Sequence, residues 1–417
     1  MLFVLAACAQ TPTARVGSTA VSVPPINALT AAAAPVPSLE VPTTAPTVLP
    51  EPILTVPEGF QVSVYAADLG EVRAIAFAPN GTPFVTIMNR GEKFGGKVLA
   101  LPDADGDGRA DQAIVVREGF FRPHGIRFLN NDIYVSDTST VYRMRDADND
   151  YVAEDLVVVV DGLPTEGDHW SRPFVFDSNG DMLLAIGSTC NTCQEGDKRR
   201  ATIRRFRMNG SQPVDQHGEL VAAGLRSVVG LALQPGSGTL WASNNGPDHL
   251  GPDLPPDQLF EITPGSHYGW PYCYGNRTPD PEVLADDTIP APEGTTKDAF
   301  CREQAAPPAL LLPAHSAPLG MTFYSGEQFP EAMRGDLFLA LHGAYDHVNK
   351  LGYRVVRIPI VDGVAGEPQD FLTGFTIDSV DRWLGRPVDV QVGPDGSLWV
   401  TDDAKGRVYT IRYTGTP

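Results

Sequence analysis

Apolar and polar residues alternate in short runs that recur along the chain at roughly fifty-residue intervals, a spacing typical of repeat folds. Each unit reads as one alternating run, a tight turn of Asn, Asp, Gly or Pro, and a second alternating run, which is the pattern of two paired strands. Six units occur, at 74–86, 125–137, 174–187, 230–244, 320–341 and 389–402. No long amphipathic helical pattern competes with them, so the sequence predicts an all-β fold.

A third strand-like run follows each unit, and a fourth follows most of them. The third runs lie at 97–102, 140–145, 202–208, 258–263, 353–359 and 407–413, and fourth runs lie at 113–120, 156–163, 219–225 and 370–375. Six repeats of four antiparallel strands are typical of a six-bladed β-propeller. The run 59–69 has no blade of its own and is predicted to pair with the last blade, closing the ring. A large β-sandwich is the alternative, which the sixfold repeat disfavours.

In a propeller, the loops that lead into the innermost strands open on one face of the central channel, where binding sites usually form. These loops are predicted to gather basic side chains on one rim: His124, His169, His315, Arg122, Arg172, Arg226 and Arg386. One of the loops reads GDHWSRP (167–173) and places His169 beside a tryptophan at the start of a strand. His169 is therefore a candidate base, and a packed turn residue is the alternative.

The beginning of the chain has a different composition. The run MLFVLAAC (1–8) resembles a bacterial lipobox, which predicts that Cys8 is lipidated. Residues 9–54 are rich in Ala, Pro and Thr and carry few charges, as expected of an extended tether. This leaves 55–417 as the propeller, with an insertion at about 248–305. A lipid anchor and a tether predict an extracytoplasmic protein, in the periplasm or at the cell surface, that contacts the membrane only through its anchor.

Four cysteines remain after Cys8: Cys190, Cys193, Cys273 and Cys301. An even number in an oxidising compartment favours disulfides, and the spacings suggest the pairs 190–193 and 273–301. A four-thiolate zinc site is the alternative, although the second pair lacks the close spacing of such sites.

The charge of the chain limits its partners. Lys and Arg number 31 against 51 Asp and Glu, a formal net charge of −20. Nucleic acid is therefore excluded as an expected partner. An anionic ligand would need local Arg or Lys side chains to hold it against this overall field.

An aspartate-rich segment, DADGDGRAD (103–111), has the spacing of a calcium-binding loop. Its candidate ligands are Asp103, Asp105, Asp107 and Asp111, with Gly108 at the sharp turn. The position of the usual bidentate glutamate is occupied by Ile114. A structural Ca²⁺ ion is predicted here, and a plain polar hairpin is the alternative.

Several motifs resemble the pyrroloquinoline-quinone (PQQ) dependent sugar dehydrogenases, especially the L-sorbosone and pyranose dehydrogenase branch; soluble glucose dehydrogenase is a more distant relative. They read HWSRP, GLRSVVG, NNGPDH, GSHYGWP, LPAHSAPLG and GRPVDV, within about residues 55–413. The resemblance implies a six-bladed propeller that binds PQQ beside a calcium ion. It also implies that His169 removes the substrate hydroxyl proton while hydride passes to the quinone.

The resemblance assigns further residues to the cofactor site. Arg226 and Arg386 match arginines that pair with cofactor carboxylates. Asn245, Gly246 and Pro247 match the loop that offers oxygens to the cofactor and calcium.

One cofactor-binding position departs from the pattern. The glucose enzymes use a lysine in the fifth blade, where this chain reads ALHGAYDHVNK (340–350). His342 is the first candidate for that position, and Lys350 is the second.

The leading hypothesis is a PQQ-dependent dehydrogenase that oxidises a sugar or sugar-aldehyde. Its electrons must pass to a separate quinone or cytochrome, because Gln194 follows Cys193 and excludes a Cys-x-x-Cys-His haem motif. A calcium-dependent lactonase or hydrolase is one alternative, which the His and Arg rim does not favour. A non-catalytic propeller that binds carbohydrate or protein is another, since the fold alone does not choose.

Overall fold

The computed structural model describes residues 51–284, 292–344, 351–376 and 383–415. The predictions for Cys8, for Lys350 and for most of the tether lie outside these residues. The chain divides into two units, Met1–Val48 and Leu49–Pro417, and the fold below is that of the second.

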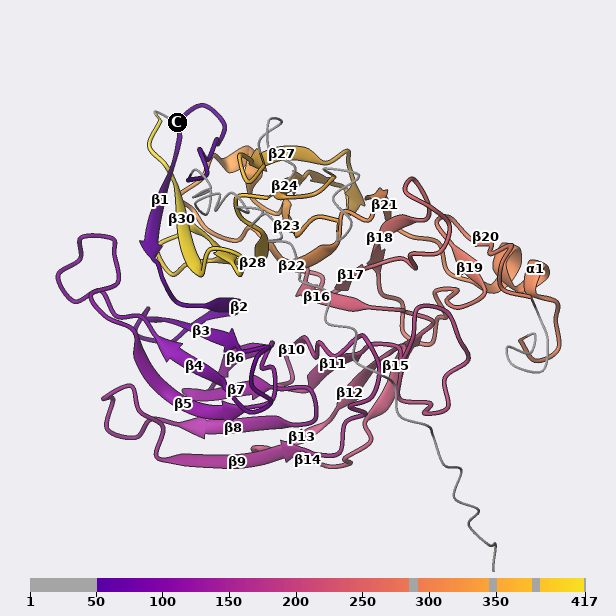
Figure 1. The fold of residues 1–417 in the computed structure, drawn as a ribbon, viewed down its shortest axis with the longest axis horizontal. Coiled ribbons are helices and arrows are strands. Elements are labelled where there is room, and N and C mark those ends of the chain that lie inside the picture. The colour runs from indigo at the N-terminus through magenta and orange to yellow at the C-terminus, as the bar shows by residue number, and fades with distance from the viewer. Residues whose placement is uncertain (1–50, 285–291, 345–350, 377–382, 416–417) are drawn as a thin grey trace, which may run out of the picture. The chain divides into compact units, whose positions relative to one another are not determined.

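Six four-stranded antiparallel sheets make up this unit, and they are arranged as the blades of a propeller (Figure 1). Blade 1 contains β2 (Glu71–Phe77), β3 (Pro83–Met88), β4 (Gly96–Ala100) and β5 (Ile114–Phe120). Blade 2 contains β6 (Ile126–Leu129), β7 (Asp132–Ser136), β8 (Val141–Arg145) and β9 (Asp155–Val160). Blade 3 contains β10 (Phe174–Phe176), β11 (Met182–Ile186), β12 (Thr202–Phe206) and β15 (Glu219–Ala223). The predicted repeat is confirmed in these three blades.

The second half of the unit repeats the arrangement. Blade 4 contains β16 (Val228–Leu233), β17 (Leu240–Asn244), β18 (Pro256–Glu261) and β21 (Leu310–Ala314). Blade 5 contains β22 (Pro318–Phe323), β23 (Leu337–Leu341), β24 (Arg354–Ile358) and β27 (Gln369–Leu372). Blade 6 contains β28 (Pro387–Val392), β29 (Leu398–Asp402), β30 (Arg407–Tyr413) and β1 (Phe60–Ala66). Short hairpins and turns complete the unit: β13 (Met208–Asn209), β14 (Gln212–Pro213), β19 (Cys273–Tyr274), β20 (Thr278–Pro279), β25 (Ile360–Val361), β26 (Val364–Ala365), α1 (Lys297–Ala299), η1 (Phe300–Gln304) and η2 (Glu331–Met333).

The ring is closed by β1, as the sequence predicted. This strand pairs antiparallel with β30, and Phe60 lies opposite Tyr413. The ring of Phe60 packs edge-on against Phe329 and Phe371 at centroid distances of 4.8 and 5.1 Å. The first strand of the unit is thereby joined by hydrogen bonds and aromatic packing to its last strand and to blade 5.

The insertion lies within blade 4, although the sequence pattern placed it between blades 4 and 5. Residues 262–309 leave the blade after β18 and return to it as the outer strand β21. The sequence pattern did not reveal the outer strand of this blade, because about fifty residues separate β21 from β18. This is far more than a usual hairpin connection. Figure 1 shows the segment carrying β19, β20 and α1 beyond the outer edge of the blade.

Both predicted disulfides are present, linking Cys190 to Cys193 and Cys273 to Cys301. The second closes the insertion, where Cys301 is fully buried beside Phe300. No helix in the part of the chain that the structure describes is long and apolar enough to cross a membrane.

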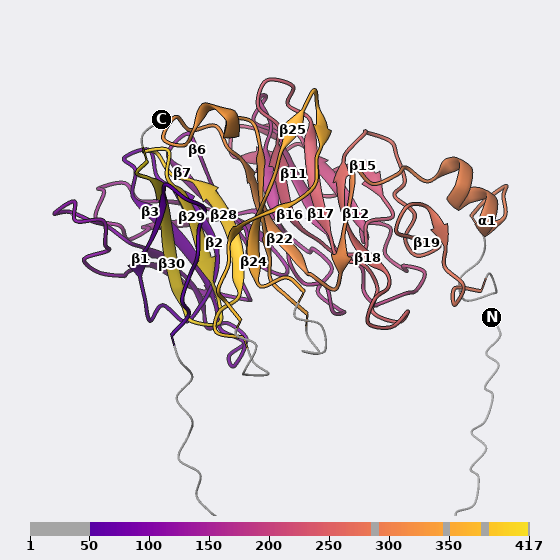
Figure 2. The same cartoon turned by 90° about the horizontal axis from the view of Figure 1, so that it is seen from above.

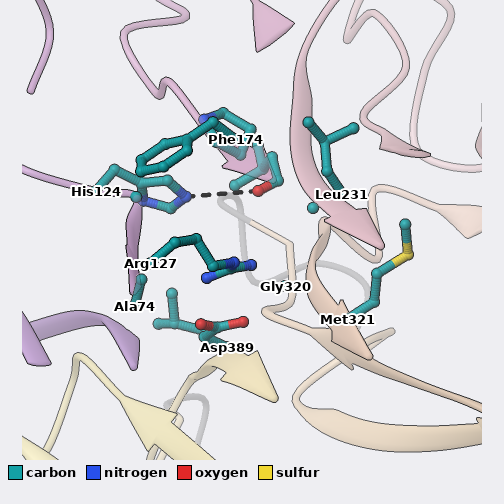
Figure 3. Close-up of a pocket in the computed structure, with 13 residues that line it drawn as sticks. Ala74, His124, Arg127, Phe174, Leu231, Gly320, Met321 and Asp389 are labelled. Carbon is teal, nitrogen blue, oxygen red and sulfur yellow. Dashed lines mark hydrogen bonds between the residues drawn. The ribbon is translucent and has the colours of Figure 1, made fainter. Parts of the chain in front are cut away.

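Side chains of the six innermost strands fill the central channel. A narrow cavity at the centre of the ring is lined by residues from each of these strands, labelled in Figure 3: Ala74, Arg127, Phe174, Leu231, Met321 and Asp389. The cavity left between them measures about 20 Å³, room for about one water molecule. The channel interior is therefore packed, and a ligand must bind at its rim.

Candidate active site

A cavity of about 370 Å³ lies among the rim loops. Because strands alternate in direction, the loops that enter each innermost strand share a face with those joining the second and third strands. Figure 2 shows the blades standing side by side, with loops gathered at the ends of the strands. The cavity is lined by seven of the residues that the sequence singled out: His169, Arg226, Asn245, Gly246, His315, His342 and Arg386.

The imidazole of His169 is held by Ser188. Its Nδ1 lies 2.8 Å from Ser188 Oγ and 3.1 Å from Ser188 O. The Ser188 hydroxyl donates its own hydrogen to Cys190 O, at 2.8 Å, so both partners of Nδ1 act as acceptors. Nδ1 therefore carries the proton, and Nε2 keeps a lone pair. A serine therefore orients the imidazole.

Burial keeps His169 uncharged. Loss of solvent, followed by the nearby charge of Arg226, lowers the pKa of His169 from 6.5 to about 3. The close packing depends on Gly187, where an added Cβ would lie 2.6 Å from Cβ of His169. The site thus presents a neutral imidazole in a fixed position.

Arg226 lies across the cavity wall and is 5% exposed. Its Nε and one terminal nitrogen donate to O and Oδ1 of Asn191, at 3.1 and 2.7 Å. The other terminal nitrogen donates to Asn245 O at 3.3 Å. Asp248, whose side chain is 69% exposed, lies 3.1 Å from the guanidinium. Only this last partner is an exposed, negatively charged group that a ligand anion could replace.

Arg386 is held by fewer partners than Arg226. Its Nε and one terminal nitrogen donate to the carbonyls of His342 and Gly343, at 3.2 and 2.9 Å. The guanidinium carbon lies 5.4 Å from the ring centre of Trp383 and 5.9 Å from that of Tyr353. These contacts fix the plane of the guanidinium, and its second terminal nitrogen donates no hydrogen bond to any described residue.

A buried ion network that the sequence did not reveal supports His342. Asp403 accepts from His342 Nε2 at 2.9 Å and from Arg73 at 2.7 Å. Burial alone would raise the pKa of Asp403, but His342, Arg73 and Arg386 together hold it well below its usual range. Burial lowers the pKa of His342 to about 4, so the imidazole is neutral near pH 7 and donates to the carboxylate.

The 245–247 loop is anchored from below by Asp257. One carboxylate oxygen accepts from Gly246 N at 2.8 Å, and the other accepts from Ala317 N at 2.9 Å. Burial raises the pKa of Asp257 to about 6. Among the described residues, no hydrogen bond ends on the carbonyl oxygen of Gly246 or Pro247, so these oxygens remain available as ligands.

The aspartate-rich loop joins β4 to β5 and lies on the opposite face from the cavity, as strand direction requires. Ligand oxygens of Asp103, Asp105 and Asp107 lie within 4.8 Å of one another. Asp111 is not part of this group; its carboxylate accepts from Ala104 N at 2.7 Å. The first three expected ligands are thus brought together, and the fourth is not.

Three of the basic residues expected on the rim do not line the cavity. Arg172 is 1% exposed and donates to the carbonyls of Pro164, His169 and Ser171, which stabilises the loop that carries His169. Arg122 lies over the ring of Phe121. His124 is buried in the channel, where Nε2 lies 3.5 Å from Val229 O (Figure 3).

Comparison with known proteins agrees with this architecture. A family model described as TrAA12-like matches residues 54–414. The match spans most of the chain, so the protein belongs to this family, and its resemblance to PQQ-dependent sugar dehydrogenases is confirmed.

Two curated relatives illustrate the range of similarity. An uncharacterized protein of Borreliella burgdorferi is 28% identical over 377 residues, covering 86% of this chain and 91% of that protein. The PQQ-dependent pyranose dehydrogenase of Coprinopsis cinerea is 26% identical over 283 residues, covering 57% of this chain and 38% of that enzyme. The match therefore spans less than half of the length of that dehydrogenase.

Two solved structures share the fold. The calcium structure of the AA12 enzyme of Trichoderma reesei has a TM-score of 0.74 at 22% identity, covering 89% of this chain and 99% of that one. The holo PQQ domain of the Coprinopsis cinerea pyranose dehydrogenase has a TM-score of 0.70 at 23% identity, covering 87% and 98%. At these identities the likeness concerns the fold.

Proposed function

We propose that this protein is an extracytoplasmic dehydrogenase that oxidises a sugar or sugar-aldehyde with PQQ beside Ca²⁺. The observation that carries the proposal is one cavity where Arg226 and Arg386 flank a neutral histidine with an available Nε2 lone pair. The named dehydrogenase relatives support the same reading. The substrate, acceptor and location go beyond those relatives and are proposed here.

The donors in the cavity fit a rigid cofactor with three carboxylates. Arginine forks pair well with carboxylates, and Arg386 has an uncommitted terminal nitrogen. In a chain of net charge −20, such local cations are required to hold a polyanion. His342 occupies the place expected of a lysine and, being neutral, would contribute a hydrogen-bonding partner and not a charge.

When bound, PQQ supplies a quinone that accepts hydride from the substrate carbon. The chain supplies the base: Nε2 of His169 takes the hydroxyl proton, because Nδ1 already holds one toward Ser188. The carbonyl oxygens of Gly246 and Pro247 are the type of ligand that Ca²⁺ prefers. Asp257 fixes the backbone that presents them.

Reconstitution tests the proposal. Purified protein given PQQ and Ca²⁺ is expected to reduce an electron-accepting dye in the presence of aldoses, and to remain inactive when PQQ is omitted. Hydrolysis of lactones with Ca²⁺ alone, with no dye reduction, would instead establish the hydrolase alternative.

In the protein without cofactor, His169 is expected to stay neutral from about pH 8 to about pH 5, where an ordinary imidazole would become charged. Its pKa is lowered to about 3, so protonation starts only as the pH falls toward that value. A cofactor carboxylate bound beside Arg226 would offset the repulsion between Arg226 and a protonated His169. It would thereby raise the pKa of His169 and make it a stronger base. NMR titration of the ring signals, assigned with His169→Gln, measures this, and an inflection near pH 6.5 would contradict it.

The Asp248→Asn variant is expected to bind PQQ about two- to fivefold more tightly, the range for an exposed charge pair. Asp248 competes with a ligand carboxylate for Arg226, at 3.1 Å, and adds a negative charge to the cavity. Asp253→Asn changes an exposed carboxylate of the same loop that does not line the cavity and serves as the control. Equal affinity in the two variants would argue against this competition.

The location is proposed from the sequence of the first 54 residues and from the two disulfides, which suit an oxidising compartment. A Cys8→Ser variant is expected to leave the membrane fraction of a cell expressing a version with a working signal peptide. Unchanged membrane association would reject the lipid anchor. Electrons are proposed to pass to a separate quinone or cytochrome.

The calcium loop on the opposite face remains a proposal. The clustering of Asp103, Asp105 and Asp107 supports it, whereas Asp111 points to the backbone of the loop. A Ca²⁺-dependent rise in melting temperature that is lost in Asp103→Asn would support it, and an identical rise in the variant would reject it.

A further inference from the structure

The loop closed by the Cys190–Cys193 disulfide contacts a candidate cofactor arginine directly and reaches the candidate base through Ser188. It follows β11 and begins two residues after Ser188, the partner of His169. Its second residue, Asn191, is the partner of Arg226. Nothing in the sequence motifs assigns a role to either polar side chain.

Ser188 connects this loop to the base. It is fully buried, and its hydroxyl donates to Cys190 O at 2.8 Å. A hydroxyl has one hydrogen, so Ser188 Oγ can meet His169 Nδ1 only as an acceptor. The position of Cys190 O therefore makes the hydroxyl an acceptor for Nδ1–H at 2.8 Å, in addition to the Ser188 carbonyl at 3.1 Å, and both favour the proton on Nδ1.

Asn191 connects the same loop to the arginine. Its carbonyl oxygen accepts from Nε of Arg226 and from Nε1 of Trp270, each at 3.1 Å. Its side-chain oxygen accepts from Arg226 at 2.7 Å and from Asp248 N at 3.0 Å. Two oxygens of one residue thus fix one edge of the guanidinium and the loop beyond it.

We propose that the disulfide-closed loop is a positioning element that sets the tautomer of His169 through Ser188 and the orientation of Arg226 through Asn191. The roles of base and cofactor arginine rest on the proposed function; the positioning itself does not. A four-residue loop closed by a disulfide retains little conformational freedom, so both contacts are held in a fixed relation.

The tautomer is tested on the cofactor-free protein. Histidine-selective ¹⁵N NMR, with His169 assigned by its absence in His169→Gln, is expected to show the proton on Nδ1. Ser188→Ala removes the shorter contact and keeps the longer one, to the carbonyl of residue 188, and is expected to give a mixture of tautomers. A wild-type proton on Nε2, or a spectrum unchanged in Ser188→Ala, would overturn the assignment.

The arginine is tested by a double-mutant cycle on PQQ binding. Asn191→Ala is expected to weaken binding about three- to tenfold in the wild type, and to have no further effect in Arg226→Ala, because its action passes through Arg226. Thr192→Ala is the matched control, since that side chain contacts His249. If the effects of Asn191→Ala and Arg226→Ala on PQQ binding were additive, the proposal would be contradicted. Equal PQQ affinities of the Asn191→Ala and Thr192→Ala variants would also contradict it.

The disulfide is tested last. The Cys190→Ser, Cys193→Ser double variant is expected to show both defects together, a mixed tautomer and weaker PQQ binding. The Cys273→Ser, Cys301→Ser double variant, which opens the insertion, is expected to keep the wild-type tautomer. Unfolding curves of both double variants serve as the control that each is folded. If the wild-type protein binds no PQQ, the proposed function fails. The tautomer spectra of these variants still decide the positioning proposal. A wild-type spectrum in the Cys190→Ser, Cys193→Ser variant would reject that proposal.

Discussion

The His169→Gln variant is expected to fold and to bind PQQ, yet to reduce bound PQQ with substrate ~10²–10⁴-fold more slowly, the usual effect of losing a general base. Glutamine offers no basic nitrogen, whereas His169 presents the lone pair of Nε2 to the cavity. Absorbance of the cofactor in a single turnover measures this step apart from electron transfer to an acceptor.

Two measurements make the result specific. Circular dichroism and PQQ affinity close to wild type would show that the loss concerns the chemical step, since a merely packed histidine would affect stability instead. A wild-type rate of PQQ reduction would remove His169 as the base. His315 would then be the next candidate, because it also lines the cavity, whereas His124 is buried in the channel.

Truncating Arg226 or Arg386 to alanine is expected to weaken PQQ binding by about 1.5–3 kcal/mol each, the range for a hydrogen bond to a charged group. This corresponds to roughly 10- to 150-fold in the dissociation constant. Isothermal titration of the cofactor-free protein at fixed Ca²⁺ measures the change.

The controls separate local contact from overall charge. Arg109→Ala removes an exposed positive charge from the β4–β5 turn on the opposite face and is expected to leave the affinity unchanged. Arg386→Lys keeps a charge but loses the planar fork, so it is expected to be intermediate. Wild-type affinity in both alanine variants would show that the cavity does not hold the carboxylates.

The repeat made much of this architecture predictable. Hairpins of equal spacing imply blades, and blades imply that their loops meet on one rim. This reasoning predicts that His169, Arg226 and Arg386 lie together, and all three line one cavity. The repeat predicts where the backbone of each loop lies, but not the direction in which its side chains point. Arg172 belongs to the same loop as His169, yet its guanidinium turns back onto nearby carbonyls.

The contacts that support the site could not be read from the repeat. Arg73 and Asp403 lie 330 residues apart and meet only because the ring closes. Ser188 is one of many serines in loops, and its importance follows from the hydroxyl that it shares between Cys190 and His169. Such pairings depend on side-chain geometry between neighbouring loops, which a single sequence does not encode in any local pattern.

The pairing of β1 with β30 also dictates an order of events during synthesis. The ribosome makes β1 first and its partner last, so the edge of the first strand stays unpaired until the whole propeller has emerged. A contact between the first and last strands of the propeller spans about 350 residues, and such long-range pairing is expected to form late. Exposed strand edges invite intermolecular pairing, so an incomplete chain is at risk of aggregation until β30 arrives. The seven residues of β30 therefore decide whether the first strand becomes part of a native sheet.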